Sequence, residues 1–554
     1  MMRLFMIPMA VAIGGLAVAP AVQGQSDSSA WSQWRANTAK TGSAVADGPA
    51  LTHDWTRDDV DIVAPGGFSV GSNGDIYYKS MDDDGTWVYR IDPADGSTVA
   101  KSINLGGVVG SYSGVAVGVE QLYTTVYVAE GDTSIIVLDK NTLDVLGTIS
   151  HPEFLGLRGT PVISEVPNQF GNYTLYVVDR NGIQMHAVDA TTGDLLWSYD
   201  LPADVSFGQL GPLWLDGNNR QVVAHFCNAQ NFGGVAIADN GDGTYEELWV
   251  GGPDSFNWWG SGALSADGLR IYVTTFNDGD VPPLWAIDVE DGSIVWDVPG
   301  YRDDPDREMN FFARPAVVDD RVYCGGGRGV VACYQDLGGR AELMWDYRDQ
   351  EDEYTCLSAV KAQDGNTYIY AVRQGLIQIP NRGTLVVLRD DGDTYTKLLE
   401  TDLDGLMLPT LYSNSSCTID DAGNLYIGGG NSFDEGVNPG GIYKFTPDVT
   451  GLALTTVGTC PGDMRFKADG ATANEKVAFI YAEGTGSVSI PSGNPCVGTM
   501  LGLNGTAKLA GVVNADATGL AKFDTRVPSK ACGRIYMQAL DLTTCGTSNV
   551  VLIE

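Results

Sequence analysis

The sequence predicts an all-β protein: an eight-bladed β-propeller followed by a small C-terminal β-sandwich. Three observations lead to this fold class. Short strands with alternating hydrophobic and polar residues run through most of the chain, a hairpin motif returns about every fifty residues, and the composition changes near residue 458. We expect a signal peptide over 1–24, the propeller over 25–458 and the sandwich over 459–554.

The overall composition is that of a folded and strongly acidic protein. Of 554 residues, 44% are hydrophobic and 19% are charged, and 33 Lys and Arg residues stand against 70 Asp and Glu, for a formal charge of −37. This balance is typical of globular chains. Because a negative field repels phosphate backbones and anionic lipids, we expect no nucleic-acid partner and no membrane insertion.

The first 24 residues resemble a secretory signal peptide. Arg3 is their only charge, Leu4–Ala19 is an almost unbroken apolar run, and Val22–Gly24 offers a small-x-small cleavage site before Gln25. The alternative is a membrane anchor, for which the run is short. We therefore expect an exported protein, periplasmic or extracellular.

A repeated hairpin is the most informative feature of the chain. Its sharpest copies begin at Tyr89, Met185 and Leu284 and read YRIDPADGSTVAKSINL, MHAVDATTGDLLWSYDL and LWAIDVEDGSIVWDVPG. A strand ends at an Asp that caps the turn through backbone N–H groups, and Gly supplies the positive φ that the turn requires. Weaker copies complete a set of eight markers, and so eight units: Asp92, Asp139, Asp189, Asp239, Asp288, Gln335, Arg389 and Thr446.

Each unit has the same internal order of strands. A short apolar run comes first, then an alternating strand such as Thr174–Val178 or Arg270–Thr274, then the strand that ends at the marker, and last a strand that often carries Trp. Four short antiparallel strands in about fifty residues are typical of a propeller blade. The alternative, a β-solenoid, has shorter coils and no recurring hairpin Trp.

Four of the Trp residues follow their markers at a similar spacing: Trp197, Trp249, Trp296 and Trp345. Spread around a ring, each would pack against the neighbouring blade and bury about 150–250 Å². The alternative is that they stack on a ligand. We expect packing.

The nine cysteines of an exported chain are disulfide candidates. Cys460, Cys496, Cys532 and Cys545 form an even set that suggests two bridges of open connectivity. Cys324 and Cys333 flank a hairpin tip and are either a cross-strand disulfide or two small buried residues. Cys227, Cys356 and Cys417 leave an odd thiol. No Cys-x-x-Cys-His is present and the four His residues lack ligand spacing, so we expect neither c-type haem nor zinc.

The D-x-x-x-G-x-x-x-W copies, together with Trp31–Asn37, resemble PQQ-like repeats. These repeats build the eight-bladed propellers of quinoprotein alcohol dehydrogenases and of the outer-membrane assembly lipoprotein. The resemblance extends from Trp31 to about Val457. It implies a ring that is closed by pairing N-terminal chain with the last blade, and Trp31–Arg35 is the candidate for that role.

The resemblance leaves catalysis open. Quinoprotein dehydrogenases hold PQQ between a Trp and a vicinal disulfide, with a Ca²⁺ ion and an Asp base, whereas this chain has no Cys-Cys dipeptide. Soluble sugar-oxidising relatives work without that disulfide. No motif assigns a catalytic residue or a metal ligand. We therefore expect a non-catalytic protein that needs no cofactor. The alternative is a PQQ- and Ca²⁺-dependent dehydrogenase that oxidises alcohols or sugars.

A ligand would bind where the loops that lead into the innermost strands meet at the channel rim. Arg could hold a carboxylate in two hydrogen bonds, and Trp could stack on a flat or sugar ring. The expected function is binding of a protein or glycan partner on a propeller face or at this rim. The alternative is that these side chains only line and plug the channel. The candidates are Arg158, Gln209, Asn257, Trp258, Trp259, Arg314 and Asn414.

Three acidic clusters, Asp82–Gly85, Asp239–Gly243 and Asp390–Asp393, resemble fragments of calcium loops, but none has the spaced Glu of an EF-hand. We expect solvated hairpin turns instead. After Gly458 the Trp residues stop, Thr, Ala and Gly increase, and alternating runs such as Lys476–Tyr481 appear, which predicts the β-sandwich.

Overall fold

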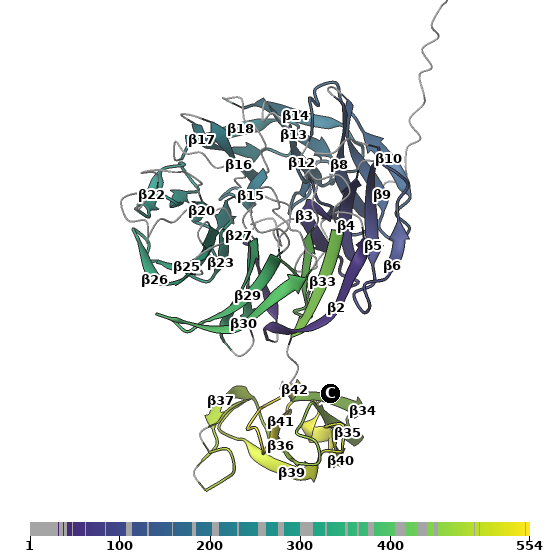
Figure 1. Ribbon diagram of the computed structural model, residues 1–554, viewed down its shortest axis with the longest axis vertical. Helices are drawn as coiled ribbons and strands as arrows, with labels where there is room; N and C mark the ends of the chain where they lie inside the picture. The colour runs from purple at the N-terminus through teal and green to yellow at the C-terminus, as the bar shows by residue number, and fades with distance from the viewer. Residues whose placement is uncertain are drawn as a thin grey trace, which may run out of the picture. The chain divides into compact units, whose positions relative to one another are not determined.

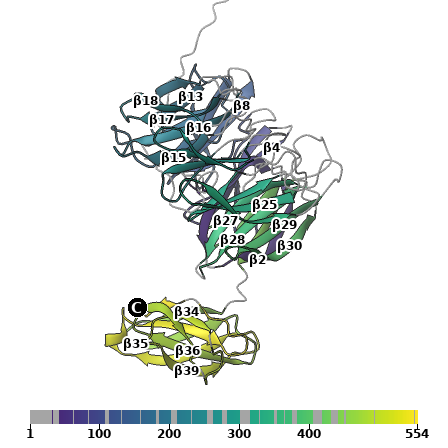
Figure 2. The same ribbon diagram turned by 90° about the vertical axis from the view of Figure 1, so that its left-hand side faces the viewer.

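A computed structural model shows an all-β chain (Figures 1 and 2). It describes residues 32, 37, 41–46, 48–60, 63–82, 85–106, 113–129, 132–157, 159–179, 184–201, 210–229, 232–252, 262–274, 282–299, 314–326, 329–348, 353–362, 365–374, 382–404, 417–429, 440–447, 452–491, 493–497, 499–548 and 550–553. The chain divides into two compact units, Met1–Thr446 and Pro447–Glu554. The predicted signal peptide, 1–24, lies outside the described residues.

The first unit contains eight sheets in its described part, numbered here in chain order. In sheets 1 to 6, four consecutive strands pair in chain order. Their bounds are β3 (Val63–Val70), β4 (Ile76–Asp82), β5 (Gly85–Ile91) and β6 (Thr98–Lys101); β7 (Ala116–Val117), β8 (Gln121–Ala129), β9 (Asp132–Asp139) and β10 (Val145–Ile149); β11 (Val162–Ile163), β12 (Thr174–Val178), β13 (Gln184–Asp189) and β14 (Leu195–Asp200); β15 (Leu210–Leu215), β16 (Gln221–Ala229), β17 (Phe232–Asp239) and β18 (Tyr245–Gly251); β19 (Ala263–Leu264), β20 (Arg270–Thr274), β21 (Leu284–Asp288) and β22 (Ile294–Asp297); β23 (Ala316–Val318), β24 (Arg321–Gly326), β25 (Val330–Asp336) and β26 (Ala341–Arg348).

Sheets 7 and 8 each include a strand from the start of the chain. Sheet 7 has the order β1-β27-β28-β29-β30, and sheet 8 has the order β2-β33-β32-β31. Their bounds are β1 (Ser43–Ala46), β2 (Ala50–Val60), β27 (Glu353–Ala362), β28 (Thr367–Gln374), β29 (Arg382–Asp390), β30 (Tyr395–Asp404), β31 (Thr418–Ile419), β32 (Leu425–Gly429) and β33 (Gly440–Pro447).

The burial of the strands follows their place in each sheet. In sheets 1 to 6 the first strand lies nearest the middle of the unit and the last lies towards its periphery (Figure 1). The second strand β12 is buried at every residue, whereas the outer strand β22 has one buried residue, Trp296, and is exposed at both ends. Middle strands are therefore covered on both faces, which explains why their sequences are nearly continuous apolar runs.

Apolar clusters join each sheet to the next. Six clusters connect sheets 1 and 2, 2 and 3, 3 and 4, 4 and 5, 5 and 6, and 6 and 7. A seventh contains residues of sheets 7, 8 and 1, among them Tyr370, Tyr426 and Phe68. Strand β3 contacts β31 and β32, and Thr418 Oγ1 donates to the Phe68 carbonyl oxygen at 3.2 Å. The series of contacts thus returns to its first sheet.

The strand that pairs with the last sheet is β2, which corrects the prediction of Trp31–Arg35 for this role. Strand β2 pairs with β33, and Lys444 Nζ lies 2.8 Å from Asp54 Oδ2. Within the predicted segment only Ser32 is described, and its carbonyl oxygen accepts a hydrogen bond from Val117 of sheet 2.

The predicted Trp packing is confirmed: Trp197, Trp249, Trp296 and Trp345 are only 5–6% exposed. Trp249 of sheet 4 donates from Nε1 to the Val289 carbonyl oxygen of sheet 5, and Trp296 of sheet 5 donates to Asp336 of sheet 6. Trp345 of sheet 6 donates in the same way to Asp390 of sheet 7, whereas the buried Nε1 of Trp197 has no hydrogen-bond partner.

Two markers were placed one residue too early. The turn-capping residue of sheet 6 is Asp336, whose Oδ1 accepts from the Gly338 amide, and that of sheet 7 is Asp390, whose Oδ1 accepts from the Gly392 amide. The predicted positions were Gln335 and Arg389. In both sheets the residue before the capping Asp is polar too, so the sequence alone leaves the position of the cap uncertain by one residue.

Cys324 and Cys333 are free and buried, so of the two alternatives that the sequence left open the disulfide is the one that the structure excludes. Cys324 pairs across the hairpin with Ala332, and Cys333 pairs with Tyr323. Successive residues of a strand point to opposite faces, so the two thiols enter different cores, Cys324 between sheets 5 and 6 and Cys333 between sheets 6 and 7. The alternative, two small buried residues, is the observed one.

The second unit begins before the predicted boundary at residue 458. Strand β34 (Ala453–Gly458) pairs with β35 (Gly462–Asp469) and so belongs to it. Two further sheets are described, β39-β36-β41-β42 and β37-β38, and β35 also pairs with β40. The remaining bounds are β36 (Lys476–Ala482), β37 (Thr485–Ser489), β38 (Met500–Leu503), β39 (Lys508–Asn514), β40 (Ala521–Val527), a 3-10 turn η2 (Ser529–Ala531), β41 (Tyr536–Asp541) and β42 (Val551–Leu552).

Two disulfides staple the second unit, as the even set of cysteines predicts. The bridges are Cys460–Cys532 and Cys496–Cys545. One apolar core, with Phe466 from the β34-β35-β40 sheet and Phe479 from the β39-β36-β41-β42 sheet, lies between the two larger sheets. Among the described residues, no helix has the length and apolar character that crossing a membrane requires.

Candidate functional site

The residues predicted at the channel rim come just before inner strands in the sequence. Arg158 precedes β11, Gln209 precedes β15, Asn257, Trp258 and Trp259 precede β19, Arg314 precedes β23, and Asn414 precedes β31. Of these only Arg314 is described; the other six lie outside the described residues. Arg314 is 5% exposed, so its guanidinium is in the interior of the first unit and not on an open surface.

Hydroxyl groups join the inner strands of neighbouring sheets. Ser69 Oγ donates to the Val115 carbonyl oxygen at 2.6 Å, which links sheets 1 and 2. Thr160 Oγ1, two residues beyond Arg158, accepts from the Gly114 amide at 2.8 Å, which links sheets 2 and 3. Ser358 Oγ donates to the Cys417 carbonyl oxygen at 2.7 Å and links sheets 7 and 8. These bonds fix the inner strands relative to one another.

A buried amine lies next to this hydroxyl network. Lys79 of β4 is 0% exposed, and its Nζ donates to Ser113 Oγ and to the Thr125 carbonyl oxygen, both at 2.7 Å. Burial lowers the pKa of Lys79 from 10.5 to about 7. Thr125 in turn donates from Oγ1 to the Gly159 carbonyl oxygen, adjacent to Arg158. Lys79 was missed because a single Lys in an alternating strand carries no sequence signal of burial.

The N-terminal segment hydrogen-bonds to three of the inner strands. The Ser32 carbonyl oxygen accepts from Val117, the last residue of β7, at 2.9 Å. The Thr41 carbonyl oxygen accepts from Val317 of β23 at 2.9 Å, and β1 pairs in parallel with the second half of β27. The described part of this segment thus contacts inner strands of sheets 2, 6 and 7.

The acidic side chains at the markers serve the contacts between sheets. Asp336 accepts from the Tyr272 hydroxyl at 2.7 Å and from Trp296 Nε1 at 3.1 Å, and Arg270 lies 3.2 Å away. Burial, followed by the hydrogen bond to Asp336, raises the pKa of Tyr272 well above its ordinary value, so the phenol stays a donor. Asp390 is bound in the same way, with the residues Tyr323, Trp345 and Arg321 in the corresponding roles.

The acidic cluster Asp239–Gly243 is a hairpin turn, as predicted. Asp239 accepts from the Tyr176 hydroxyl at 2.8 Å and from the Gly241 amide at 2.8 Å, while Asp242 bonds to Thr244 within the turn. Within the described ranges, no three His, Cys, Asp or Glu side chains converge as a metal site would require. Asp83 and Asp84 lie outside those ranges.

A second titratable cluster lies between the third sheet and the preceding loop. His186 Nδ1 is 2.8 Å from Ser198 Oγ, and His186 Nε2 is 3.4 Å from Asp179 Oδ2. The Ser198 hydroxyl donates its only proton to Glu153 Oε2 at 2.7 Å, so it cannot also donate to His186. His186 is 0% exposed. The cluster is therefore a hydrogen-bonded link to the loop, and a serine nucleophile would need its proton directed to the histidine instead.

Comparison with known proteins identifies one family. The family model described as outer membrane protein assembly factor BamB, a PQQ-like repeat model, matches residues 84–379, just over half of the chain. No curated protein matches the chain. Two similar solved structures are a putative 6-phosphogluconolactonase from Bacteroides uniformis and the β-propeller domain of Cps50 (Swd1) from Myceliophteria thermophila.

The first structure has 17% identity and a TM-score of 0.35, over 52% of this chain and 86% of that chain. The second has 11% identity and a TM-score of 0.34, over 59% of this chain and 93% of that chain. With the family model matched from β5 of sheet 1 to β28 of sheet 7, the chain belongs to the PQQ-like repeat family of the outer membrane protein assembly factor BamB.

Proposed function

We propose that the first unit is an eight-bladed PQQ-like β-propeller that binds a partner without catalysis, at the mouth where its inner strands begin. The partner is a protein or a glycan. A protein is the first choice, because the family model is named for a protein assembly factor. The second unit is then a small β-sandwich on the same exported chain, in the periplasm or outside the cell.

The observation that carries this proposal is the path of the N-terminal segment. Its Ser32 and Thr41 carbonyl oxygens accept from β7 and β23, and β1 pairs with β27, so this segment already uses hydrogen-bonding groups of three inner strands. The partner would bind instead at the loops that lead into the inner strands, whose sequences include Arg158, Gln209, Trp258, Trp259 and Asn414. Cationic, amide and indole side chains are those that bind carboxylates and extended chains.

The alternative, a PQQ- and Ca²⁺-dependent dehydrogenase, finds no matching donor set. The sequence has no Cys-Cys dipeptide, and in the part of the chain that the structure describes no three acidic, His or Cys side chains converge. The marker carboxylates Asp336 and Asp390 are already bonded to Tyr, Trp and Arg. We therefore propose no reaction on a quinone or a calcium ion for this chain.

The test compares a rim variant with wild type and with a control variant. Purified wild type is applied to an array of extended peptides and to a glycan array, beside the variant Arg158→Ala with Trp259→Ala. Arg314 is left unchanged because its burial would confound the result. The control is Lys361→Gln, near the end of β27, where the side chain is 39% exposed.

Loss of the bound peptides or glycans in the rim variant alone is the expected result. Equal binding by all three proteins would contradict the proposal that the partner binds at the rim. Reduction of a dye by alcohols or sugars, after incubation with PQQ and Ca²⁺, would overturn the non-catalytic function.

A further inference from the structure

The second unit contains a pocket of about 540 Å³ that the function proposed above does not use. It lies over the face of the β39-β36-β41-β42 sheet that is turned away from the core shared with β34, β35 and β40. Its floor is formed by Ile480, Leu501 and Leu540, which are 8%, 5% and 2% exposed. The volume is within the range of small-molecule sites.

The lining of the pocket is aliphatic. Val488, Ile490 and Leu542 continue the floor, and Leu509 and Val512 of β39 reach the mouth, where they are 61% and 43% exposed. None of the described residues that line the pocket is aromatic. Stacking on a sugar ring or a base is thereby unavailable, and a flexible hydrocarbon chain is the ligand whose surface matches these walls.

One cation stands at the mouth. Lys508 lines the pocket with an exposed side chain, and the ion pairs found among the described residues do not include it. In a chain of formal charge −37 an exposed ammonium beside an apolar cavity favours a ligand whose polar end is anionic. The lining has two other polar side chains, Ser489 and Asn494, and the Asn494 amide donates to the Pro491 carbonyl oxygen at 3.2 Å.

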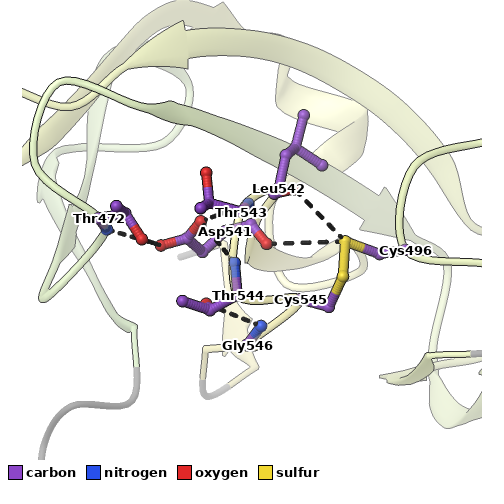
Figure 3. Close-up of a disulfide and its surroundings, with 8 residues drawn as sticks. All are labelled: Thr472, Cys496, Asp541, Leu542, Thr543, Thr544, Cys545 and Gly546. Carbon is purple, nitrogen blue, oxygen red and sulfur yellow. Dashed lines mark hydrogen bonds between the residues drawn. A yellow bond between two sulfur atoms is a disulfide. The ribbon is translucent and has the colours of Figure 1, made fainter.

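A disulfide holds one wall of the pocket in place. Ile490, Pro491 and Pro495 form this wall, and the adjacent Cys496 is bridged to Cys545 in the turn after β41 (Figure 3). The Cys496 sulfur lies 3.8 Å from the carbonyl oxygens of Asp541 and Leu542. Because the bridge joins the wall to the floor strand, little ordering is required when a ligand enters.

The turn that receives the disulfide is itself fixed by hydrogen bonds. Asp541 Oδ2 accepts from the Thr472 amide at 2.6 Å and from the Thr472 hydroxyl at 2.7 Å, and Oδ1 accepts from the Thr543 amide at 2.8 Å (Figure 3). Leu540 and Leu542, on either side of Asp541, both line the pocket. The turn after β41 therefore holds both the floor and the wall of the pocket in place.

We propose that this pocket binds a single aliphatic chain that ends in a carboxylate, with the hydrocarbon on Ile480, Leu501 and Leu540 and the carboxylate beside Lys508. The site is independent of the propeller rim, because every residue it uses lies in the second unit.

The test is isothermal titration of the full chain with decanoate and with 1-decanol, both below their aggregation limits. Ala507→Phe places a ring into the pocket and is expected to weaken both ligands at least tenfold. Val512→Phe at the mouth provides a second block if the first variant has an altered melting curve. Lys508→Gln is expected to weaken decanoate by about two- to fivefold, as an exposed ion pair would, and to leave 1-decanol unchanged. Lys476→Gln, outside the pocket, is the matched control and should bind as wild type does.

The absence of saturable decanoate binding to wild type, or equal binding by folded Ala507→Phe and Val512→Phe variants, would overturn the proposal. So would sedimentation data showing a wild-type dimer that these variants dissociate, because the pocket would then be an interface with a second copy. Tenfold weaker binding by a folded, monomeric variant supports it.

Discussion

At the scale of single residues, the buried carboxylates at the markers of sheets 6 and 7 bond to side chains of the preceding sheet. Asp336 is the clearest case: a phenol, an indole and a guanidinium from sheet 5 meet one carboxylate of sheet 6. Removing one partner of such a group leaves the others buried and unsatisfied, which is far more costly than the loss of an exposed ion pair. The repeated Asp therefore caps its own turn and also orients the preceding sheet.

Lys79 gives a residue-scale prediction about pH. Its pKa is lowered from 10.5 to about 7 by burial, so between these values the unfolded chain holds a proton that the folded protein lacks. The contribution of Lys79 to the free energy of unfolding should thus rise with pH, by about 1.4 kcal/mol per pH unit within this window. Below pH 7 both states are protonated and the contribution is constant.

The measurement is denaturant unfolding of wild type and Lys79→Met from pH 6 to pH 10, followed by Trp fluorescence. The difference between the two free energies should be flat below pH 7 and then increase in favour of wild type. A difference that stays constant across the whole range would show that Lys79 keeps its proton in the folded protein.

At the scale of the element, the hairpin motif has a packing explanation that its sequence only suggests. Gly96 and Gly292 occupy the same place in two copies, with φ of 72° and 71°. A Cβ on Gly96 would lie 2.7 Å from the ring of Trp55, and a Cβ on Gly292 would lie 2.7 Å from the ring of Trp249. The Gly is therefore required for the turn and also for the Trp of the preceding sheet.

Gly292→Ala tests the two requirements separately, with Gly268→Ala as the matched control. Gly268 has the same left-handed conformation, φ of 72°, but open space around its Cβ position. Gly268→Ala should lower the free energy of unfolding by about 1–2 kcal/mol, because Ala is strained in the left-handed conformation. Gly292→Ala should lower it by about 1–3 kcal/mol more, because the new methyl group must also displace Trp249. Chemical denaturation of the two variants measures both losses. Equal losses would mean that the indole moves aside freely.

Local patterns predicted the strands and the capping Asp residues because these depend on neighbours within one hairpin, and the regular recurrence of the hairpin predicted the Trp packing against the next sheet. The pairing of β2 with β33 could not be predicted in the same way, since nearly the whole first unit separates the two strands in sequence. The state of Cys324 and Cys333 stayed open for a related reason: their spacing is compatible with a hairpin, but the register that separates their faces is set by the turn.

At the scale of the whole molecule, the two units differ in what stabilises them. The first unit relies on apolar clusters that continue from each sheet to the next, and the described cysteines Cys324, Cys333 and Cys417 are buried within it. The second unit is small and has two disulfides around its cores. Small domains bury a lower fraction of their surface and depend more on such bridges.

This division predicts two separable unfolding transitions in the full chain. All 12 Trp residues precede residue 447, so Trp fluorescence reports only the first unit. Replacing Cys460 and Cys532 with Ala removes a bridge across a sequence separation of 72 and should destabilise the second unit by about 2–5 kcal/mol. Far-ultraviolet circular dichroism should then show an earlier transition, while the fluorescence midpoint stays where it is in wild type. A shift of the fluorescence midpoint by the same amount would show instead that the units unfold as one cooperative body, in which the disulfides of the second stabilise the sheets of the first.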